Sequence, residues 1–289
     1  MEAGKTPRRL IPRYTNDSRE FLDHVGAFLR RRPVEHSVLL SVATAHLGEP
    51  VASADADLWL WAEDNGEVVV AAQHTPPHAA YLSTGPAPAI HVLARSLWLM
   101  RPGLPGVAGL GNAPLEFAAQ WSRLGGPKAT PTMQLGVYAA DDVTLPRGIA
   151  GLLRPATEAD AVLLRRWVDQ FVAEAGVKSV TADQIGPRID ARLLFVWEVD
   201  GTPVSMAAVT AAAGGVSRVQ YVYTPPKIRN HGYASACVAA LTARELDHPG
   251  RTCMLFTDLA NPTSNGIYQA VGYRRLGQAA ELTFAALTP

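Results

Sequence analysis

The stretch VYTPPKIRNHGYAS, residues Val222–Ser235, decides the fold of the second half of this chain. An aliphatic and aromatic run ends at Thr224, where Pro225 and Pro226 stop a strand. A helix is expected to follow Gly232, because small residues fill its first turn. At such a strand–loop–helix junction the first backbone N–H groups of the helix lack partners, and the helix dipole is positive there. The junction is therefore suited to binding a pyrophosphate, which the backbone at Gly232 can approach closely.

The elements expected around this junction form a mixed α/β domain. Before it, three strands joined by tight glycine turns make an antiparallel meander, with expected ranges Leu193–Val199, Val204–Ala211 and Val216–Thr224. After it come a helix, a strand at Thr252–Thr257, a short helix around Ser264–Ala270, and a final strand pair near Arg274 and Leu282–Ala285. A further helix is expected to begin at Thr157, because Thr157 and Asp160 have the spacing of a capping box.

Two motifs in this half resemble the signatures of a known superfamily. Arg229-x-x-Gly232-x-Ala234 is similar to the R/Q-x-x-G-x-G/A motif of the GCN5-related N-acetyltransferases (GNATs). The segment Asn261–Tyr268, followed by Gly272-Tyr273, is similar to the N-x-x-S-x-x-[LI]-Y…G-[FY] segment of the same superfamily. Both motifs occur in the expected order and structural context, and the resemblance covers residues 153–286.

The resemblance implies an acetyl-CoA-dependent N-acetyltransferase, with acetyl-CoA as the acyl donor and a small-molecule or peptide amine as the acceptor. Backbone N–H groups of the strand that ends at Thr224 would bind the thioester carbonyl, and the loop after it would hold the pyrophosphate. Tyr268 would be the catalytic general acid that protonates the departing thiolate. The implied coenzyme-binding residues are Val222, Tyr223, Thr224, Arg229, Asn230, His231, Gly232, Tyr233, Ala234, Ser235, Asn261 and Ser264.

One departure from the superfamily pattern leaves the general base unassigned. Many GNATs carry a glutamate on the third meander strand, whereas Val216–Thr224 contains no carboxylate. Glu198 on the preceding hairpin is a candidate for this role. The missing carboxylate keeps a rival hypothesis open, namely a non-catalytic acyl-CoA-binding or regulatory module on the same fold. Trp167, Phe171 and Tyr233 are candidates for lining an apolar acceptor pocket, although the fold alone does not choose the acceptor.

The first half repeats part of this order of elements, which predicts a tandem duplication. Trp61 aligns with Trp197, each before a glycine turn, when the sequence is shifted by about half its length. A linker near Asp141–Leu153 divides residues 1–145, a degenerate GNAT-like domain, from residues 146–289, the catalytic domain. Each domain is expected to be a largely antiparallel sheet flanked by helices.

The first copy is expected not to bind a coenzyme. Its counterpart of the pyrophosphate loop, Tyr81–Pro88, has no arginine, and its prolines remove N–H donors. Its expected role is structural: to cover a sheet edge or to shape the acceptor cleft. Gly106-x-x-Gly109-x-Gly111 in the same half has the wrong spacing for a dinucleotide-binding fingerprint and is interpreted as flexible turn sequence.

Composition excludes several other classes of function. The chain has 289 residues, and its 26 basic and 26 acidic residues balance, so neither duplex DNA nor an anionic membrane is an expected partner. The two cysteines, Cys237 and Cys253, are too few for a disulfide framework and are interpreted as buried small hydrophobes, and no metal site is expected. No apolar run reaches the roughly 18 residues of a membrane span. We expect a soluble, cytoplasmic protein that is a monomer or a homodimer.

Overall fold

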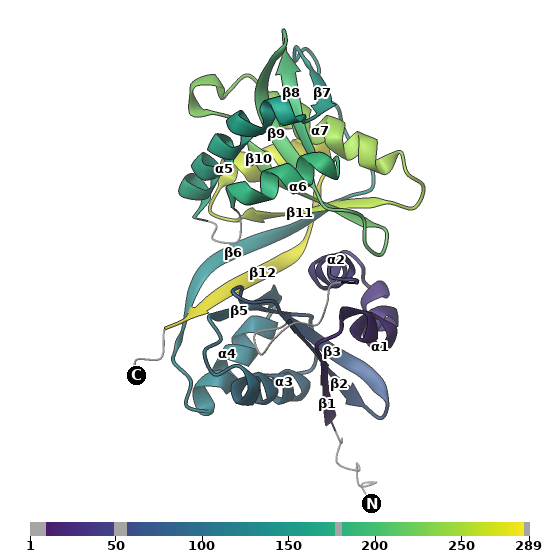
Figure 1. Cartoon of the computed structure of the whole chain (residues 1–289), viewed down its shortest axis with the longest axis vertical. Coiled ribbons are helices and arrows are strands. Elements are labelled where there is room, and N and C mark those ends of the chain that lie inside the picture. Colours follow the sequence, from purple (N-terminus) through teal and green to yellow (C-terminus); the bar gives the residue numbers. More distant parts are fainter. Residues whose placement is uncertain (1–9, 49–56, 177–180, 286–289) are drawn as a thin grey trace, which may run out of the picture. The chain divides into compact units, whose positions relative to one another are not determined.

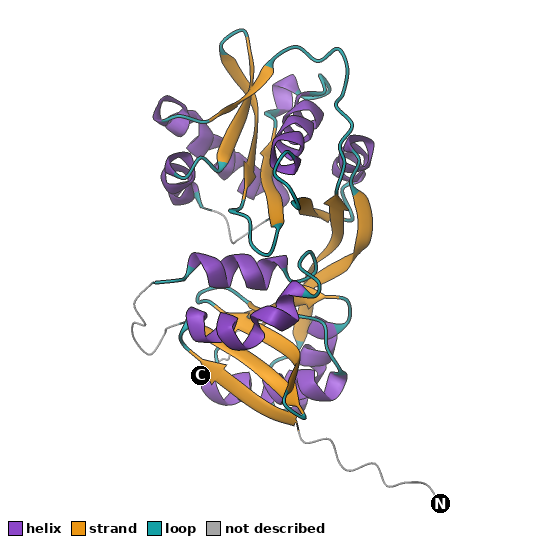
Figure 2. Cartoon of the chain, turned by 90° about the vertical axis from the view of Figure 1, so that its right-hand side faces the viewer, coloured by secondary structure: helices purple, strands orange, loops and turns teal. Residues whose placement is uncertain are grey.

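A computed structural model describes residues 10–48, 57–176 and 181–285 of the chain (Figures 1 and 2). The chain forms two compact units: unit 1 takes the described residues up to Leu135 and from Gly277 onward, and unit 2 takes those from Gly136 to Leu276. The sequence-based division after residue 145 instead gave the entire second half to one domain. Within the described ranges, no helix is long and apolar enough to cross a membrane.

The described residues of unit 2 form five strands of its own and four helices, in the order that the sequence predicts. The strands are β7 (Leu152–Pro155), β8 (Leu194–Val199), β9 (Thr202–Val209), β10 (Val216–Tyr223) and β11 (Thr252–Asp258). The helices are α5 (Ala161–Ala175), α6 (Ile185–Asp190), α7 (Tyr233–Leu246) and α8 (Pro262–Val271), with short 3-10 turns at Glu158–Asp160, Ala182–Gln184 and Pro226–Ile228. The strand order is β11-β10-β9-β8-β7, and only the pair of β10 and β11 is parallel.

The two faces of this sheet bury different side chains, because neighbouring residues of a strand point to opposite faces. On one face Val196 of β8 belongs to a cluster with α5 and α6, which includes Leu164. On the other face Phe195 belongs to a cluster with α7 and α8, which includes Leu241 and Val271. Helices therefore cover both faces of a largely antiparallel sheet, and the predicted mixed α/β fold is confirmed.

Unit 1 has the same order of elements as unit 2 (Figure 1). Its strands β1 (Leu10–Thr15), β2 (Leu58–Asp64), β3 (Glu67–His74), β4 (Ala80–Leu82) and β5 (Gly106–Leu110) are neighbours in that order, and again only the last pair is parallel. Its helices are α1 (Ser18–Arg30), α2 (Ser37–Ala45), α3 (Ala87–Met100) and α4 (Ala113–Arg123). In both units a strand and two helices precede a meander, and a helix, a strand and a helix follow it. The predicted tandem duplication is confirmed.

The final strand of each copy is β6 (Ala129–Ala140) in the first and β12 (Arg274–Phe284) in the second. The predicted C-terminal strand pair is wrong, because β12 is one continuous strand. It pairs with β5 of unit 1, from Ala279 opposite Leu110 to Thr283 opposite Gly106. The full strand order runs β5-β12-β6-β11, so β12 takes the place beside β5 that the repeat would give to β6.

The glycines of β5 form a strand and not the flexible turn expected from the sequence. A Cβ atom on Gly106 would lie 2.4 Å from the carbonyl oxygen of Leu282 in β12. A Cβ atom on Gly109 would lie 2.6 Å from the carbonyl oxygen of Leu82 in β4. Glycine is therefore needed here because the strands on both sides approach β5 closely.

Candidate active site

The parallel strands β10 and β11 separate toward their carboxyl ends. They pair only from Val216 opposite Thr252 to Arg218 opposite Met254. Beyond these residues, β10 continues to Tyr223 and β11 continues for four residues without further pairing between the two. Ligands of sheets with parallel strands bind at the carboxyl ends, where neighbouring strands leave a crevice. Beyond Arg218 the backbone of β10 therefore has no partner strand on the side of β11, and the hydrogen-bond ladder of the sheet has an opening there.

A β-bulge lies in the separated part of β10. The pairing of β10 with β9 shifts between Gln220 and Tyr223, and Tyr221 has a φ angle of 57°, in the left-handed region. Residues two apart in a regular strand share a face. Here Val219 packs with α7, whereas Tyr221 packs with α5 and α6 on the opposite face. The bulge therefore redirects the backbone N–H groups of β10 at the opening.

The loop after β10 leads into an uncapped helix N-terminus. Asn230 has a φ angle of 67° and Gly232 one of 79°, so the chain turns sharply twice before α7. Gly232 is the N-cap residue of α7, and no side chain caps that end. The N–H groups in the first turn, at Tyr233, Ala234 and Ser235, are those that an anion at a helix N-terminus would use.

Gly232 also packs closely against the side chain of Ile149. A Cβ atom at this position would lie 2.6 Å from Cδ1 of Ile149, and the positive φ angle disfavours any side chain. The need for glycine in the motif therefore has a structural cause in addition to the close approach of a ligand.

Arg229 bonds to groups of the protein itself. Its Nε donates to the carbonyl oxygen of Thr224 at 2.8 Å, and its Nη2 donates to Oε2 of Glu174 at 2.6 Å. The guanidinium carbon lies 5.6 Å from the ring centroid of Tyr223. Burial and the Glu174 carboxylate raise the pKa of Tyr223, whose hydroxyl donates to Glu174 at 3.3 Å. Arg229 thus holds the loop against α5, and among the residues that the structure describes its second terminal nitrogen, Nη1, has no hydrogen-bond partner.

The second motif begins at the carboxyl end of β11. Asn261 caps α8, and its Oδ1 accepts from the backbone N–H of Ser264 at 3.0 Å. Asn265 in the next turn donates to the carbonyl oxygen of Asp258 at 2.8 Å, which fixes α8 to the end of β11. The structure therefore brings together Asn261 and Ser264 in one helix cap, beside the strand that separates from β10.

Tyr268 lies inside unit 2 on α8. Its side chain is 9% exposed, and its ring packs edge-on against Tyr273 with centroids 6.1 Å apart. Burial raises the pKa of Tyr268 to about 12, so the phenol keeps its proton over the whole neutral range. Among the described residues, no hydrogen-bond partner of its hydroxyl is present. This hydroxyl is available as a donor.

Two further expectations, about the general base and about the acceptor pocket, differ from what the structure shows. Glu198, the candidate base, pairs with Arg154 at the edge where β8 meets β7. It is therefore tied to a structural ion pair two strands away from β10. Trp167 and Phe171 pack with the tyrosines of β10, but Tyr233 packs on the α7 face and stacks on His231, so the three do not line one pocket.

The cysteines behave as small buried hydrophobes, as expected. Cys237 and Cys253 are both buried, and burial raises the pKa of each thiol to about 12. A thiol with such a pKa stays protonated at neutral pH and is a poor nucleophile.

Sequence reasoning missed the polar groups that reach β10 from the opposite side. Gln170 and Glu174 on α5 both accept from the Tyr223 hydroxyl, at 3.1 and 3.3 Å. Their spacing of four residues places them on one helix face, and this spacing could have identified them from the sequence. Arg188 on α6 donates to the Tyr221 hydroxyl at 3.1 Å. No local pattern marks Arg188, because its contact depends on the bulge.

Unit 1 lacks the corresponding opening. Its strand β4 stays paired with β5 up to Leu82, opposite Gly109. The connection from β4 to α3 is short, and a Cβ atom on Gly85 within it would lie 2.8 Å from the carbonyl oxygen of Val69. The connection after β4 therefore packs closely against β3.

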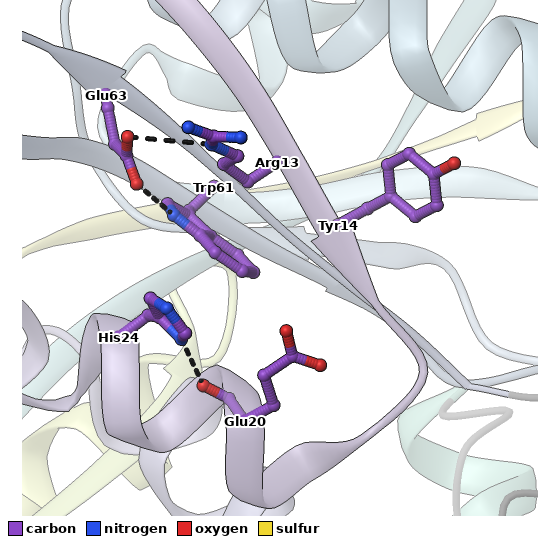
Figure 3. A pocket seen from close by; sticks show the side chains of 6 residues that line it. All are labelled: Arg13, Tyr14, Glu20, His24, Trp61 and Glu63. Carbon is purple, nitrogen blue, oxygen red and sulfur yellow. Dashed lines mark hydrogen bonds and ion pairs between the residues drawn. The ribbon is translucent and has the colours of Figure 1, made fainter. Parts of the chain in front are cut away.

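Unit 1 does have a surface hollow of about 410 Å³, between β1, α1 and β2 (Figure 3). Glu63 accepts from Nε1 of Trp61 at 2.9 Å and pairs with Arg13 at 3.7 Å. The imidazole of His24 stacks on Trp61 and bonds to the carbonyl oxygen of Glu20 at 2.9 Å. Since these groups already bond to one another, the candidate active site is the opening in unit 2.

Comparisons with known proteins agree with this architecture. The family model described as FR47-like protein matches residues 199–282, which contain β9 to α8 and most of β12. A GCN5-related N-acetyltransferase from Sphaerobacter thermophilus is similar over 99% of this chain and 98% of its own, with 14% identity and a TM-score of 0.59. A GNAT-family acetyltransferase from Colwellia psychrerythraea is similar over 96% and 100%, with 12% identity and a TM-score of 0.58.

A tandem arrangement also has a solved counterpart. A tandem GNAT protein from the clavulanic acid biosynthesis pathway covers 97% of this chain and 99% of its own, with 13% identity and a TM-score of 0.54. No curated protein matches the sequence. At these identities the likeness is one of fold, and this chain has the GNAT fold in a tandem arrangement.

Proposed function

From the tandem GNAT fold and the opening at β10, we propose that this chain is an N-acyltransferase that moves an acetyl group from acetyl-CoA to an amine. The observation that carries the proposal is the separation of β10 from β11 next to the uncapped start of α7. This arrangement offers backbone donors to a thioester and to a pyrophosphate along one continuous path. The proposal assigns catalysis to unit 2 and a structural role to unit 1.

Each part of acetyl-CoA has a matching group in unit 2. The N–H groups from Gly232 to Ser235 would hold the pyrophosphate, where the helix dipole favours negative charge. The pantetheine arm would lie against the unpaired edge of β10, as a strand would. Val222 and its neighbours in the bulge would donate N–H groups to the thioester carbonyl as negative charge develops on its oxygen. The start of α8, with Asn261 and Ser264, would form the other wall.

The transfer needs no covalent enzyme intermediate. The amine nitrogen attacks the thioester carbon, the new C–N bond forms, and the C–S bond breaks. The sulfur leaves as a thiolate and takes a proton from the Tyr268 hydroxyl. The neutral amine loses one proton to solvent after the C–N bond forms, and solvent returns one proton to Tyr268, so the protons balance. A phenol with a pKa of about 12 is fully protonated at neutral pH, so the proton that the thiolate takes is present before the reaction begins.

One observation favours a second candidate, a non-catalytic acyl-CoA-binding module. Strand β10 carries no carboxylate, and Glu174, which contacts its end, is paired with Arg229. A module that only binds the coenzyme needs no proton acceptor at this place. Such a module would also not need the Tyr268 phenol, whose hydroxyl has no hydrogen-bond partner within the described ranges.

The experiment that tests the proposal has two steps. Calorimetry with acetyl-CoA measures binding, and a thiol-release assay over a panel of amines then measures transfer. Binding with thiol release supports the enzyme, and binding without release for any amine supports the module. The absence of binding at millimolar acetyl-CoA would contradict both functions.

A further inference from the structure

A charged side chain faces the β10 bulge, and the described part of the chain gives it no counter-ion. Arg188 of α6 places its guanidinium carbon 4.5 Å from the ring centroid of Tyr221 and donates Nη2 to the Tyr221 hydroxyl at 3.1 Å. With its amide oxygen turned toward α6, Gln220 accepts from Nη1 and Nη2 of Arg188 at 2.9 and 3.1 Å. Both partners are neutral, so the positive charge is oriented but not compensated.

Three other arginines of unit 2 form ion pairs, and two of them, Arg154 and Arg251, are partly buried. Arg154 binds Asp160 and Glu198, Arg251 binds Glu245, and Arg229 binds Glu174. Within the described ranges, Arg188 forms no ion pair, and its Nε is buried without any hydrogen-bond partner. A guanidinium does not lose its proton in a protein, so removing it from water without an anion is unfavourable.

Arg188 lies on the side of the sheet where the acceptor amine would bind, and not on the side of the acyl donor. The uncapped end of α7 and the start of α8 belong to helices on one face of the sheet, and α6 covers the opposite face. Acetyl-CoA held along β10 on the α7 side would turn the other face of its thioester carbonyl toward α6. The amine would attack from that face, because attack is perpendicular to the carbonyl plane. Arg188 contacts Tyr221, which is the bulge residue itself.

We propose that Arg188 binds a carboxylate of the acceptor, so that the substrate is an amine that also carries a carboxylate, such as a free amino acid. This inference rests on the proposed function. The carboxylate would accept from Nε, the guanidinium nitrogen for which the described residues provide no partner, in a charge-assisted hydrogen bond. Tyr221 and Gln220 act as positioning residues, because they fix the plane of the guanidinium.

The decisive experiment compares amino acids with their carboxamides in the thiol-release assay. The parent protein should have a kcat/KM for at least one amino acid that is about 30-fold or more above that for its carboxamide, as one charged hydrogen-bonded pair provides. Arg188→Gln should remove this preference, mainly through a higher KM for the amino acid. Arg166→Gln, which changes an exposed arginine of α5, is the matched control and should keep it.

A second measurement separates this inference from the proposed function. Each of the twenty amino acids is titrated into the protein with coenzyme A present, for the parent and for Arg188→Gln. Binding by the parent that the variant loses supports the inference. Equal use of carboxamides, or no binding by any amino acid, overturns it. Acetyl-CoA affinity and transfer to uncharged amines report on the proposed function alone, and Arg188→Gln should leave acetyl-CoA affinity within about twofold.

Discussion

Tyr268 is the residue on which the proposed chemistry depends. Its ring is held by burial against Tyr273, and its hydroxyl has no competing partner within the described residues. We expect Tyr268→Phe to lower kcat by about 10²-fold or more, because a positioned general acid contributes at least this factor. Acetyl-CoA affinity should stay within about twofold, since the proposed contacts are backbone groups of other elements. A thiol-release assay measures kcat, and calorimetry on the same preparation measures the acetyl-CoA affinity.

The neighbouring phenol provides the control for this substitution. The Tyr273 hydroxyl bonds to Oγ1 of Thr242 at 2.8 Å inside the core. Tyr273→Phe should therefore lower the free energy of unfolding by about 1 kcal/mol and leave kcat unchanged. If the two variants lose activity equally, Tyr268 acts through packing and is not the acid.

His74 at the end of β3 makes the stability of unit 1 depend on pH. Its side chain is 4% exposed, and burial, together with the charge of Arg101, lowers its pKa from 6.5 to about 4. The unfolded chain therefore binds a proton between pH 6.5 and 4 that the folded chain does not. The free energy of unfolding should fall by up to about 3 kcal/mol across this window and level off below it.

Urea unfolding at pH 7 and pH 4.5, followed by tryptophan fluorescence, measures this loss. His74→Gln removes the titrating group, so it should lose less stability than the parent on acidification. His24→Gln changes an exposed histidine of α1, and its free energy of unfolding should fall on acidification by as much as that of the parent. Identical pH dependence in all three proteins would show that His74 is protonated in the folded state.

The element that binds the coenzyme in our proposal is the first turn of α7. Ala234 lies in this turn and is half-buried. Ala234→Glu places a carboxylate where the pyrophosphate would lie, and it should weaken acetyl-CoA binding about 100-fold or more. The same carboxylate interacts favourably with the helix dipole, so Tm should not fall. Ala234→Gln has the same size without charge and should weaken binding much less.

Arg229→Glu is a poor test of coenzyme binding, because it would also disturb the structure of the loop. Arg229 pairs with Glu174, so a glutamate there would create a repulsive pair and release the loop. Gly232→Asp would meet Ile149 and a positive φ angle. Ala234→Glu avoids both problems. If this variant keeps the Tm and the acetyl-CoA affinity of the parent protein, the pyrophosphate binds elsewhere.

At the scale of elements, local patterns predicted most of unit 2. The capping box at Thr157 forms, with the Thr157 N–H donating to Asp160 at 2.7 Å. The strand–loop–helix junction at Gly232 also forms as predicted. The bulge at Tyr221 was not predictable, because a tyrosine gives no signal for a left-handed φ angle. The glycines of β5 were misinterpreted, since their cause is a tertiary contact with β4 and β12.

At the scale of the whole molecule, the two copies differ in the pairing of the strands between which a coenzyme is proposed to bind. Unit 2 has the separated strands, and unit 1 keeps β4 and β5 paired up to Leu82. We expect one acetyl-CoA per chain, measured by native mass spectrometry of the intact protein. The Ala234→Glu variant should bind none at the same concentration. Two equivalent sites, or one site that survives in this variant, would show that unit 1 binds the coenzyme.

The place of β12 beside β5 has a consequence for the order in which the units are completed during synthesis. Domains generally fold as units from the N-terminus while the chain grows, at roughly 5–20 residues per second. The edge of β5, however, receives its partner only from residues 279–283, which are made after every other strand of both units. At that rate the edge waits roughly ten seconds or longer for its partner. The unit that is synthesised first is therefore the one that is completed last.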